Sequence, residues 1–480
     1  MNKFICLIFC LLLPCSFVKA QLSLNDALKL SIENSPTGRQ IRAQYLNNYW
    51  QFRASQAARL PQLTLNGSAP GYTRRINQVF QPDGSFVFAP VQQAFSSTNL
   101  SLSQLIPATG GILSVGSGLS RGDIFTGAST TFYNNNLLTV NLQQPIFRFN
   151  TMKWQWQQDK LQIKAATRQQ IENLEDLSLS VTQRYFDLYT AFLQLNNAKL
   201  NEAINDTIYK IARGRYGVGK IAENELLQVE LSYTNARNQV EQQVLQVKLA
   251  ERELALLLGK EVTGAEISPP VETPRFDVDP QKAILEAVQN RSDPLNWQID
   301  ENQAVRNLSE AKRNRRLNAD MNVSYGLNQT GNNFEQATQN PLESQFAGIS
   351  FTIPIASMGV NRAGQKAAEA GLEARKAQIE LNRNSLEQEV FSAALQLKQL
   401  EKSLAISAKA DTIAQKRYEV ARNRYRIGTV DITNLLIAQN EKDLALISFV
   451  TTLGNYWLAY YRLRRLTLFD FAEGKRLVME

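Results

Sequence analysis

Residues 213–227 read RGRYGVGKIAENELL, and residues 422–436 read RNRYRIGTVDITNLL. In each stretch an apolar-periodic segment runs in, a glycine interrupts it, and a second periodic segment runs out. Arg and Tyr fall in the last turn of the incoming helix, where cations suit the negative end of the helix dipole. The glycine then takes the left-handed conformation that ends the helix. Each stretch therefore predicts the turn of a helical hairpin, and their spacing of 209 positions predicts a tandem duplication.

Long helices are predicted on both sides of each turn. Leu174, Val181, Leu188 and Leu195 fall seven residues apart, which is the heptad of a coiled-coil seam. Nothing interrupts the helix predicted for 151–212, which at 1.5 Å per residue would be about 93 Å long. The second half repeats this period at Leu386, Ala393 and Leu400.

Polar and apolar residues alternate between the short and the long helices, a pattern typical of strands. The polar stretches 77–96 and 123–136 are interpreted as loops. The first half carries 49 extra residues, all in its strand region. Because each half must leave and re-enter the helical side, its number of strands must be even. Four strands plus two is the favoured count, and two plus two, with 99–119 outside the barrel, stays open.

The first twenty residues predict a secretory signal peptide. A charged start at Asn2 and Lys3 precedes a short apolar run, and Val18-Lys19-Ala20 forms a small-residue cleavage site, so Gln21 would begin the mature chain. All three cysteines lie inside this signal, which leaves the mature chain without disulfide or thiol chemistry. The alternative, that Cys15 is lipidated, is disfavoured because no small residue precedes it where processing would need one.

The predicted organisation is a signal peptide (1–20), a first structural repeat (21–264), a Pro-rich linker (265–280) and a second repeat (281–480). The first repeat comprises helices in 22–59, strands in 62–147 and a long hairpin in 150–258. The second comprises helices in 281–317, strands in 320–356, a long hairpin in 360–466 and a C-terminal segment.

Composition argues against catalysis and against nucleic acid as a partner. A net charge of +8 over 480 residues is modest, whereas nucleic-acid binding usually requires a denser basic patch. Residues 214–220 nearly spell a phosphate-binding loop, but Ile221 replaces the required Ser or Thr. The chain has no His, so zinc and copper lack their usual ligands. We therefore expect no enzyme activity, no metal and no cofactor.

Short alternating strands behind a secretory signal indicate an outer-membrane barrel. Four or six strands cannot enclose an open lumen, and an unpaired sheet edge is intolerable in lipid. Several chains must therefore share one barrel, with their hairpins packed into a cylinder below it. The fold class predicted is a mixed α+β membrane protein with long antiparallel helical hairpins. The alternative is a periplasmic coiled-coil scaffold or adaptor that never enters the membrane.

The chain resembles the TolC family of outer-membrane efflux channels over essentially its whole mature length. The resemblance rests on the duplicated halves, the opening LSLNDAL at 22–28, the QPIF at 144–147 and both Tyr-x-aliphatic-Gly turns. It implies a homotrimer with its barrel in outer-membrane lipid and a helical tunnel in the periplasm. It also implies docking to a periplasmic adaptor and an inner-membrane transporter, as the passive exit duct of a tripartite efflux or type I secretion system.

The resemblance assigns candidate functional residues to the hairpin turns. For adaptor docking these are Tyr216, Val218, Gly219, Tyr425, Ile427 and Gly428, with simple packing of the turn as the alternative for the aliphatic residues. The family's gate aspartates, six and nine positions after the second glycine, fall here on Asn434 and Ile437. The candidate constriction therefore comprises Asn434 and the nearby carboxylates of Glu223, Glu225 and Asp431. One carboxylate repeated threefold around a narrow axis would attract cations, whereas an acid in a first helical turn can simply favour the helix dipole.

Overall fold

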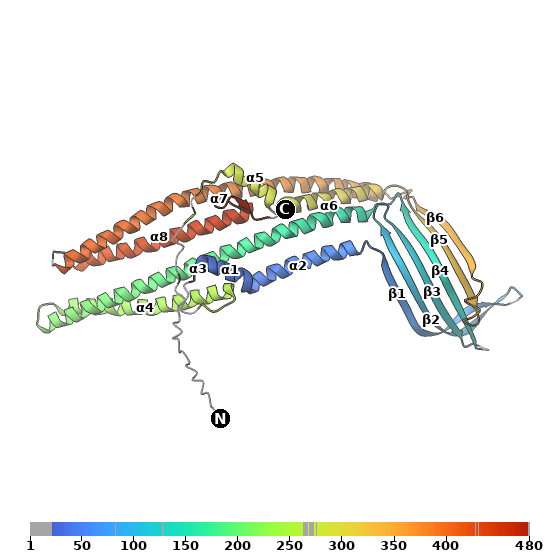
Figure 1. The fold of residues 1–480 in the computed structure, drawn as a ribbon, viewed down its shortest axis with the longest axis horizontal. Helices are drawn as coiled ribbons and strands as arrows, with labels where there is room; N and C mark the ends of the chain where they lie inside the picture. Colours follow the sequence, from blue (N-terminus) through green and yellow to red (C-terminus); the bar gives the residue numbers. More distant parts are fainter. Residues whose placement is uncertain are drawn as a thin grey trace, which may run out of the picture. The chain divides into compact units, whose positions relative to one another are not determined.

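The computed structural model describes residues 22–478 except 82, 127–128, 263–266, 268–272, 275, 428 and 431 (Figure 1). Of residues 79, 425, 426, 432 and 433 it describes the backbone alone. The predicted signal peptide, including Cys15, and much of the predicted linker lie outside the described residues.

The two halves of the chain present their elements in the same order, except that the second half has two strands fewer between its short and long helices and two short strands after them. The first half contains α1 (Leu24–Asn34), α2 (Pro36–Ala57), β1 (Gln62–Phe80), β2 (Phe86–Ile106), β3 (Gly111–Ile124), β4 (Thr130–Ile146), α3 (Thr151–Gly217) and α4 (Glu223–Leu258). The second contains α5 (Pro280–Asn290), α6 (Asp293–Arg313), β5 (Asn318–Gly331), β6 (Leu342–Thr352), α7 (Val360–Arg426) and α8 (Ile432–Thr467), followed by β7 (Phe469–Asp470) and β8 (Lys475–Arg476).

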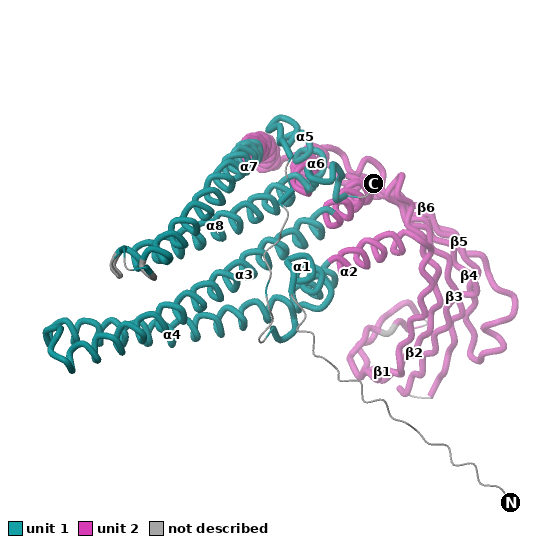
Figure 2. Tube along the Cα trace, turned by 60° about the vertical axis from the view of Figure 1, so that its left-hand side comes forward, with its two compact units in different colours: residues 1–44, 168–291, 386–480 teal, residues 45–167, 292–385 magenta. Residues whose placement is uncertain are grey.

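Two compact units are formed, and each takes segments from both halves (Figure 2). The helical unit comprises residues up to Gln44, 168–291 and 386 onward. The sheet unit comprises 45–167 and 292–385, and so holds the six long strands with the helix segments that adjoin them. Each compact unit therefore combines segments from both halves of the sequence, and neither unit corresponds to one half.

The sheet unit contains one antiparallel sheet in the order β1-β2-β3-β4-β5-β6. Four strands come from the first half and two from the second, which confirms the favoured count. Both predicted loops in the strand region are wrong. Residues 77–80 pair with 86–89, and 130–136 pair with 118–124, so strands continue through most of each stretch. Polar and apolar residues do not alternate regularly in these stretches, and alternation therefore does not mark them as strands.

The long helices match their prediction closely. α3 and α7 each span 67 residues, about 100 Å at 1.5 Å per residue. In the helical unit, Val181 and Leu188 of α3 are fully buried, as is Val390 of α7, so the heptad positions form the seam. No helix in the described part of the chain combines the length and hydropathy needed to span a bilayer.

Short amphipathic helices cover one side of the hairpins in the helical unit. Ser23 caps α1 by accepting a hydrogen bond from the backbone N–H of Asp26 at 3.2 Å, and Asp279 caps α5 in the same way from Gln281 at 3.0 Å. α1 packs on α4, and α5 packs on α8. Each buries an apolar stripe, with Ala27 and Ala283 at zero exposure.

The first hairpin turn has the backbone geometry that its sequence predicts. Gly219 has φ +67°, and its N–H donates to the carbonyl of Tyr216 at 2.8 Å. The N–H of Lys220 donates to Arg215 at 2.9 Å, which uses another carbonyl at the end of α3. Gly219 is therefore the left-handed terminator, and α4 begins four residues later.

A buried ion cluster joins α3, α8 and the C-terminal strands. Arg464 of α8 donates to both carboxylate oxygens of Glu175 of α3, at 2.7 and 3.0 Å, and to Asp470 of β7 at 3.1 Å. The carboxylates are 8% and 1% exposed. Tyr460 also donates to Asp470 at 2.9 Å, and burial raises the pKa of its hydroxyl, which keeps the donor protonated. One guanidinium thus serves two buried carboxylates from opposite halves of the chain.

Removing this guanidinium is expected to be costly. Arg464→Gln leaves two buried carboxylates without their cation, which should destabilise the fold by about 3–5 kcal/mol. The matched variant Arg462→Gln changes another arginine of α8, which forms an exposed ion pair with Glu389 of α7. Its loss should cost at most about 1 kcal/mol. Thermal unfolding in detergent, followed by circular dichroism, measures the difference. Equal losses in both variants would contradict the role given to Arg464.

Gly219 of the first hairpin turn and Gly214 near the end of α3 should respond oppositely to alanine. Gly219→Ala forces a side chain into left-handed backbone and should weaken the turn by about 1–2 kcal/mol. Gly214 lies in the last turns of α3 with open space around it, so Gly214→Ala should strengthen the helix by about 0.5–1 kcal/mol. Hydrogen exchange of peptides covering 208–226 reports both effects. Faster exchange in the Gly214 variant would show that the turn geometry is misassigned.

Candidate functional site

The predicted residues of the first turn lie together at the end of the α3–α4 hairpin. Tyr216 and Val218 are exposed, Val218 by 69%. Glu223 and Glu225 occupy the first turn of α4, and both are exposed. This placement suits the positive end of the helix dipole, so the structural alternative for the two acids fits the local geometry.

The second turn is described only in part. Ile427 is 74% exposed, close to the exposure of Val218 in the first turn. Asn434 is also exposed, within the first turn of α8. Gly428 and Asp431 lie outside the described residues, and so does the side chain of Tyr425. Both hairpins of the helical unit thus present one exposed aliphatic residue at their ends, which lie on the same side of that unit (Figure 1).

Buried polar side chains lie between α3 and α8, farther along the helices from the hairpin turns. Gln439, 2% exposed, donates to Asn201 at 2.5 Å. The Gln439–Asn201 and Arg464–Glu175 contacts keep one antiparallel register, which places Asp443 opposite Asn197. The amide nitrogen of Asn197 and the amide oxygen of Gln439 are buried without a hydrogen-bond partner among the described residues, and Asp443 contacts the ammonium group of Lys442 at 3.2 Å. Such groups are usually satisfied by ordered water, so this seam is polar. Sequence reasoning missed it, although Gln439 interrupts an apolar stripe.

The strand register of the sheet unit separates two chemically different faces. Leu65 lies opposite Leu100, and Leu102 opposite Val115, so their side chains share a face. Several of these residues are strongly exposed, Leu65 by 70% and Leu63 by 66%. This apolar face comprises Leu63, Leu65, Leu100, Leu102, Leu113, Val115, Val140, Leu142, Val323, Tyr325, Ala347 and Ile349. Two glutamines interrupt it, Gln104 opposite Leu113 and Gln345 opposite Tyr325.

The opposite face of the same strand segments carries hydroxyl and amide groups. Thr64 lies opposite Ser101, with their hydroxyl oxygens 3.3 Å apart, and Asn66 lies opposite Asn99. These central positions carry no charge across the sheet, whereas the same face also holds Phe346, opposite Ser324, and Asp320, opposite Ser350 nearer the strand ends. This neutral polar face comprises Thr64, Asn66, Asn99, Ser101, Ser114, Gly116, Thr139, Asn141, Asn322, Ser324 and Gly348. The alternation was readable from sequence, but the shared register across six strands was not.

An apolar face beside a neutral polar one suits a sheet with lipid on one side and water on the other. Exposed contiguous apolar surface of this extent marks a membrane or an interface. The sheet ends add a second feature, because β1 and β6 each pair with one neighbour among the described strands. The sheet of one chain therefore has two open edges.

The chain shares its fold with several solved membrane proteins. A membrane protein of Pseudomonas aeruginosa matches with a TM-score of 0.66 at 17% identity, over 95% of this chain and 92% of that one. The CmeC outer membrane channel of Campylobacter jejuni matches with a TM-score of 0.67 at 15% identity, over 95% and 87%. The outer membrane protein VceC of Vibrio cholerae matches with a TM-score of 0.64 at 14% identity, over 95% and 97%. These similarities establish the fold.

Sequence comparison establishes the family. No curated protein matches this chain in sequence. The family model described as outer membrane efflux protein does match, over residues 27–260 and 286–467. The match includes both long hairpins and all six strands of the large sheet, and it confirms the family resemblance inferred from the hairpin turns. The chain belongs to the outer membrane efflux protein family.

Proposed function

We propose that three copies of this outer-membrane efflux protein join their sheets into one barrel and their hairpins into one tunnel. The open edges of β1 and β6 carry the proposal. In hydrocarbon every unpaired backbone group is costly, so each edge must meet another strand. Six strands fall short of the roughly eight that leave room even for side chains inside a barrel. Pairing β6 of one copy with β1 of the next removes every edge.

The two faces of the sheet fix which side faces outward. The apolar face lies against lipid, and the neutral polar face lines the lumen. A periplasmic scaffold that stays outside the membrane, the alternative function, would leave Leu65 and Ile349 in water at 70% and 64% exposure.

The hairpins extend the barrel lumen into the periplasm. α3 and α7 are each about 100 Å long, far longer than globular helices. Their ends would meet a periplasmic adaptor and, with it, an inner-membrane transporter. Tyr216, Val218 and Gly219 of the first turn and Tyr425, Ile427 and Gly428 of the second form the proposed docking surface, in which the exposed Val218 and Ile427 supply apolar contact.

The duct is closed, in this proposal, at the same end. Glu223 and Glu225 of the first turn and Asp431 and Asn434 of the second would form the constriction when repeated by threefold symmetry. The polar seam around Gln439 supports a movable closure, because water can replace its amide contacts when α3 and α8 slide. Transport is passive, without catalysis. Removal of residues 1–20 as a signal peptide and descent of the two halves from a duplication complete the proposal.

Matched lysines on the two sheet faces test the barrel. Leu100→Lys puts a charge on the lipid side, at a cost of about 2–4 kcal/mol near the bilayer centre, and should reduce the trimer recovered from outer membranes. Ser101→Lys points into the lumen and should leave trimer yield unchanged. Detergent extraction followed by native mass spectrometry measures both. A wild-type protein that is monomeric, or water-soluble without detergent, would sink the proposal, as would reversed effects of the two lysines.

The proposed constriction predicts a change in ion selectivity. Glu225→Ser and Asp431→Ser each remove three carboxylates from the trimer and should lower its preference for cations over anions. The control Glu230→Ser removes an exposed acid farther along α4 and should have no effect. Reversal potentials in planar bilayers with a salt gradient give the measurement. Unchanged conductance and selectivity in both variants would leave the acids with only their local role at the helix start.

A further inference from the structure

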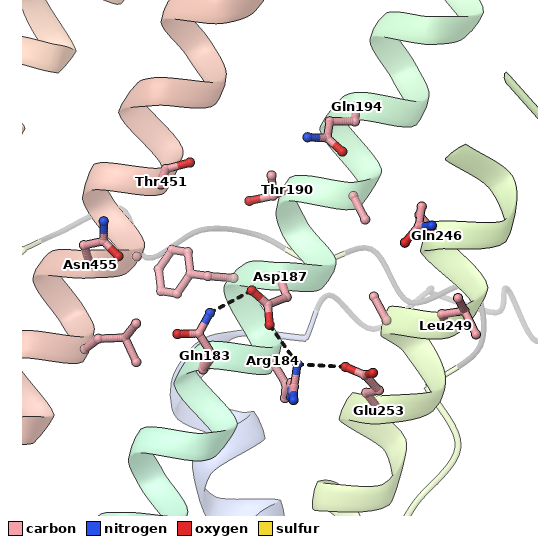
Figure 3. Close-up of a pocket in the computed structure, with 15 residues that line it drawn as sticks. Gln183, Arg184, Asp187, Thr190, Gln194, Gln246, Leu249, Glu253, Thr451 and Asn455 are labelled. Atoms are coloured by element: carbon pink, nitrogen blue, oxygen red, sulfur yellow. Dashed lines mark hydrogen bonds and ion pairs between the residues drawn. The ribbon is translucent and has the colours of Figure 1, made fainter. Parts of the chain in front are cut away.

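A cavity of about 510 Å³ lies in the helical unit among α3, α4 and α8 (Figure 3). Its lining combines amides and hydroxyls with apolar side chains, among them Phe186, Leu249 and Leu458. Gln183, Thr190 and Gln194 come from α3, Gln246 from α4, and Thr451 and Asn455 from α8. Gly454 forms part of the wall because a Cβ there would lie 3.0 Å from the ring of Phe186. The cavity is thus an open groove with a mixed polar and apolar lining.

One edge of the cavity carries three charges. Arg184 contacts Asp187 at 3.2 Å and Glu253 at 2.9 Å, as Figure 3 shows. Two carboxylates against one guanidinium leave one net negative charge. The side chains of Asp187 and Glu253 are 38% and 52% exposed, so both are accessible to a ligand from solvent. The charge therefore attracts cations without forming a closed metal site.

The cavity lies on the face of the hairpins opposite to the one that the segment before α1 and the C-terminal strands cover. Tyr185 of α3 donates to the carbonyl of Leu22 at 2.8 Å, so the segment leading into α1 covers that face. At about 100° per residue, Gln183 and Thr190 lie on the opposite face of α3. On α8, Tyr460 contacts Asp470 of the C-terminal strands, and Thr451 lies on the opposite face by the same spacing. In the proposed duct the covered side must be the outer one, because the lumen has to stay open.

We propose that this cavity is a binding site on the tunnel wall for organic cations that combine a protonated amine with an apolar body. The amine meets Asp187 and Glu253, the amides and hydroxyls take its polar substituents, and Leu249 and Leu458 contact its apolar part. The position of the site in the lumen rests on the proposed function, whereas the binding itself is a property of the helical unit. Because the ion trio is exposed, affinity is modest and falls as salt rises.

A charge series tests the site with rhodamine 6G as the cationic probe and fluorescein as the anionic one. Arg184→Gln leaves two carboxylates and should tighten rhodamine 6G binding about threefold. Asp187→Asn combined with Glu253→Gln reverses the net charge and should weaken binding about tenfold. Glu241→Gln, an exposed acid of α4 outside the cavity, should change Kd by less than about twofold. Fluorescence polarisation on full-length protein in nanodiscs, with empty nanodiscs as the background, gives the values.

The outcomes separate the site from the duct. The site is supported if rhodamine 6G binds most tightly to the Arg184 variant, less tightly to wild type and least tightly to the double variant, and if fluorescein binds more weakly than rhodamine 6G. Equal affinity in wild type and the double variant, or equal binding of the two dyes, overturns it. Single-channel recording of the same preparations tests the duct independently. If the channels conduct but the variants do not show the expected order of affinities, only the binding site is refuted. If no preparation conducts, the duct is refuted, whatever affinities the two dyes show.

Discussion

Backbone hydrogen bonding in hydrocarbon is the constraint on which the molecule depends. A strand in lipid can satisfy its N–H and C=O groups only through neighbouring strands. The sheet of one chain satisfies this between β1 and β6 but ends in two open edges. The apolar face of that sheet belongs in lipid, so the edges cannot be left to water. The proposed closure by further copies meets this constraint by pairing β6 of one copy with β1 of the next.

The helices have the opposite freedom, since each satisfies its own backbone and leaves side chains to decide how it packs. The seam between α3 and α8 uses this freedom unevenly. Near the short helices the Arg464 cluster joins them through charge-assisted hydrogen bonds, with carboxylates almost fully buried. Nearer the turns the seam passes through Gln439 and Asn201, whose amides water can replace. Strong charge-assisted contacts therefore join α3 and α8 near the short helices, whereas water can replace their contacts nearer the turns. The proposed closure requires this difference.

Sequence prediction was most accurate for elements that depend on interactions between residues close together in the chain. The heptad around Val181 and Leu188 predicted α3 nearly to its ends, and the glycine of the first turn was correctly given left-handed backbone. Prediction failed where pairing supplies the order. Residues 86–96 look like a loop because their polarity does not alternate, yet they form half of a long strand pair.

The functional residues divide in the same way. The exposed residues of the two hairpin turns could be predicted from the repeated sequence of the turn alone. The neutral polar face and the cavity of Figure 3 were not, because each depends on side chains from several elements brought into one register. The buried Gln439 left a weak signal, as one amide in an apolar stripe. Nothing local, however, identifies Asn201 as its partner 238 residues away.

The Arg464 cluster also bears on how the protein matures. Glu175 precedes Arg464 by 289 residues, so α3 emerges during synthesis long before the cation that neutralises it. Until then its carboxylate favours solvent over the core, and the first hairpin gains little by docking early. Nascent chains should thus stay loosely packed, in a form that export machinery and holding chaperones can handle. A chain truncated before Arg464 would lack this anchor and be left open to proteolysis.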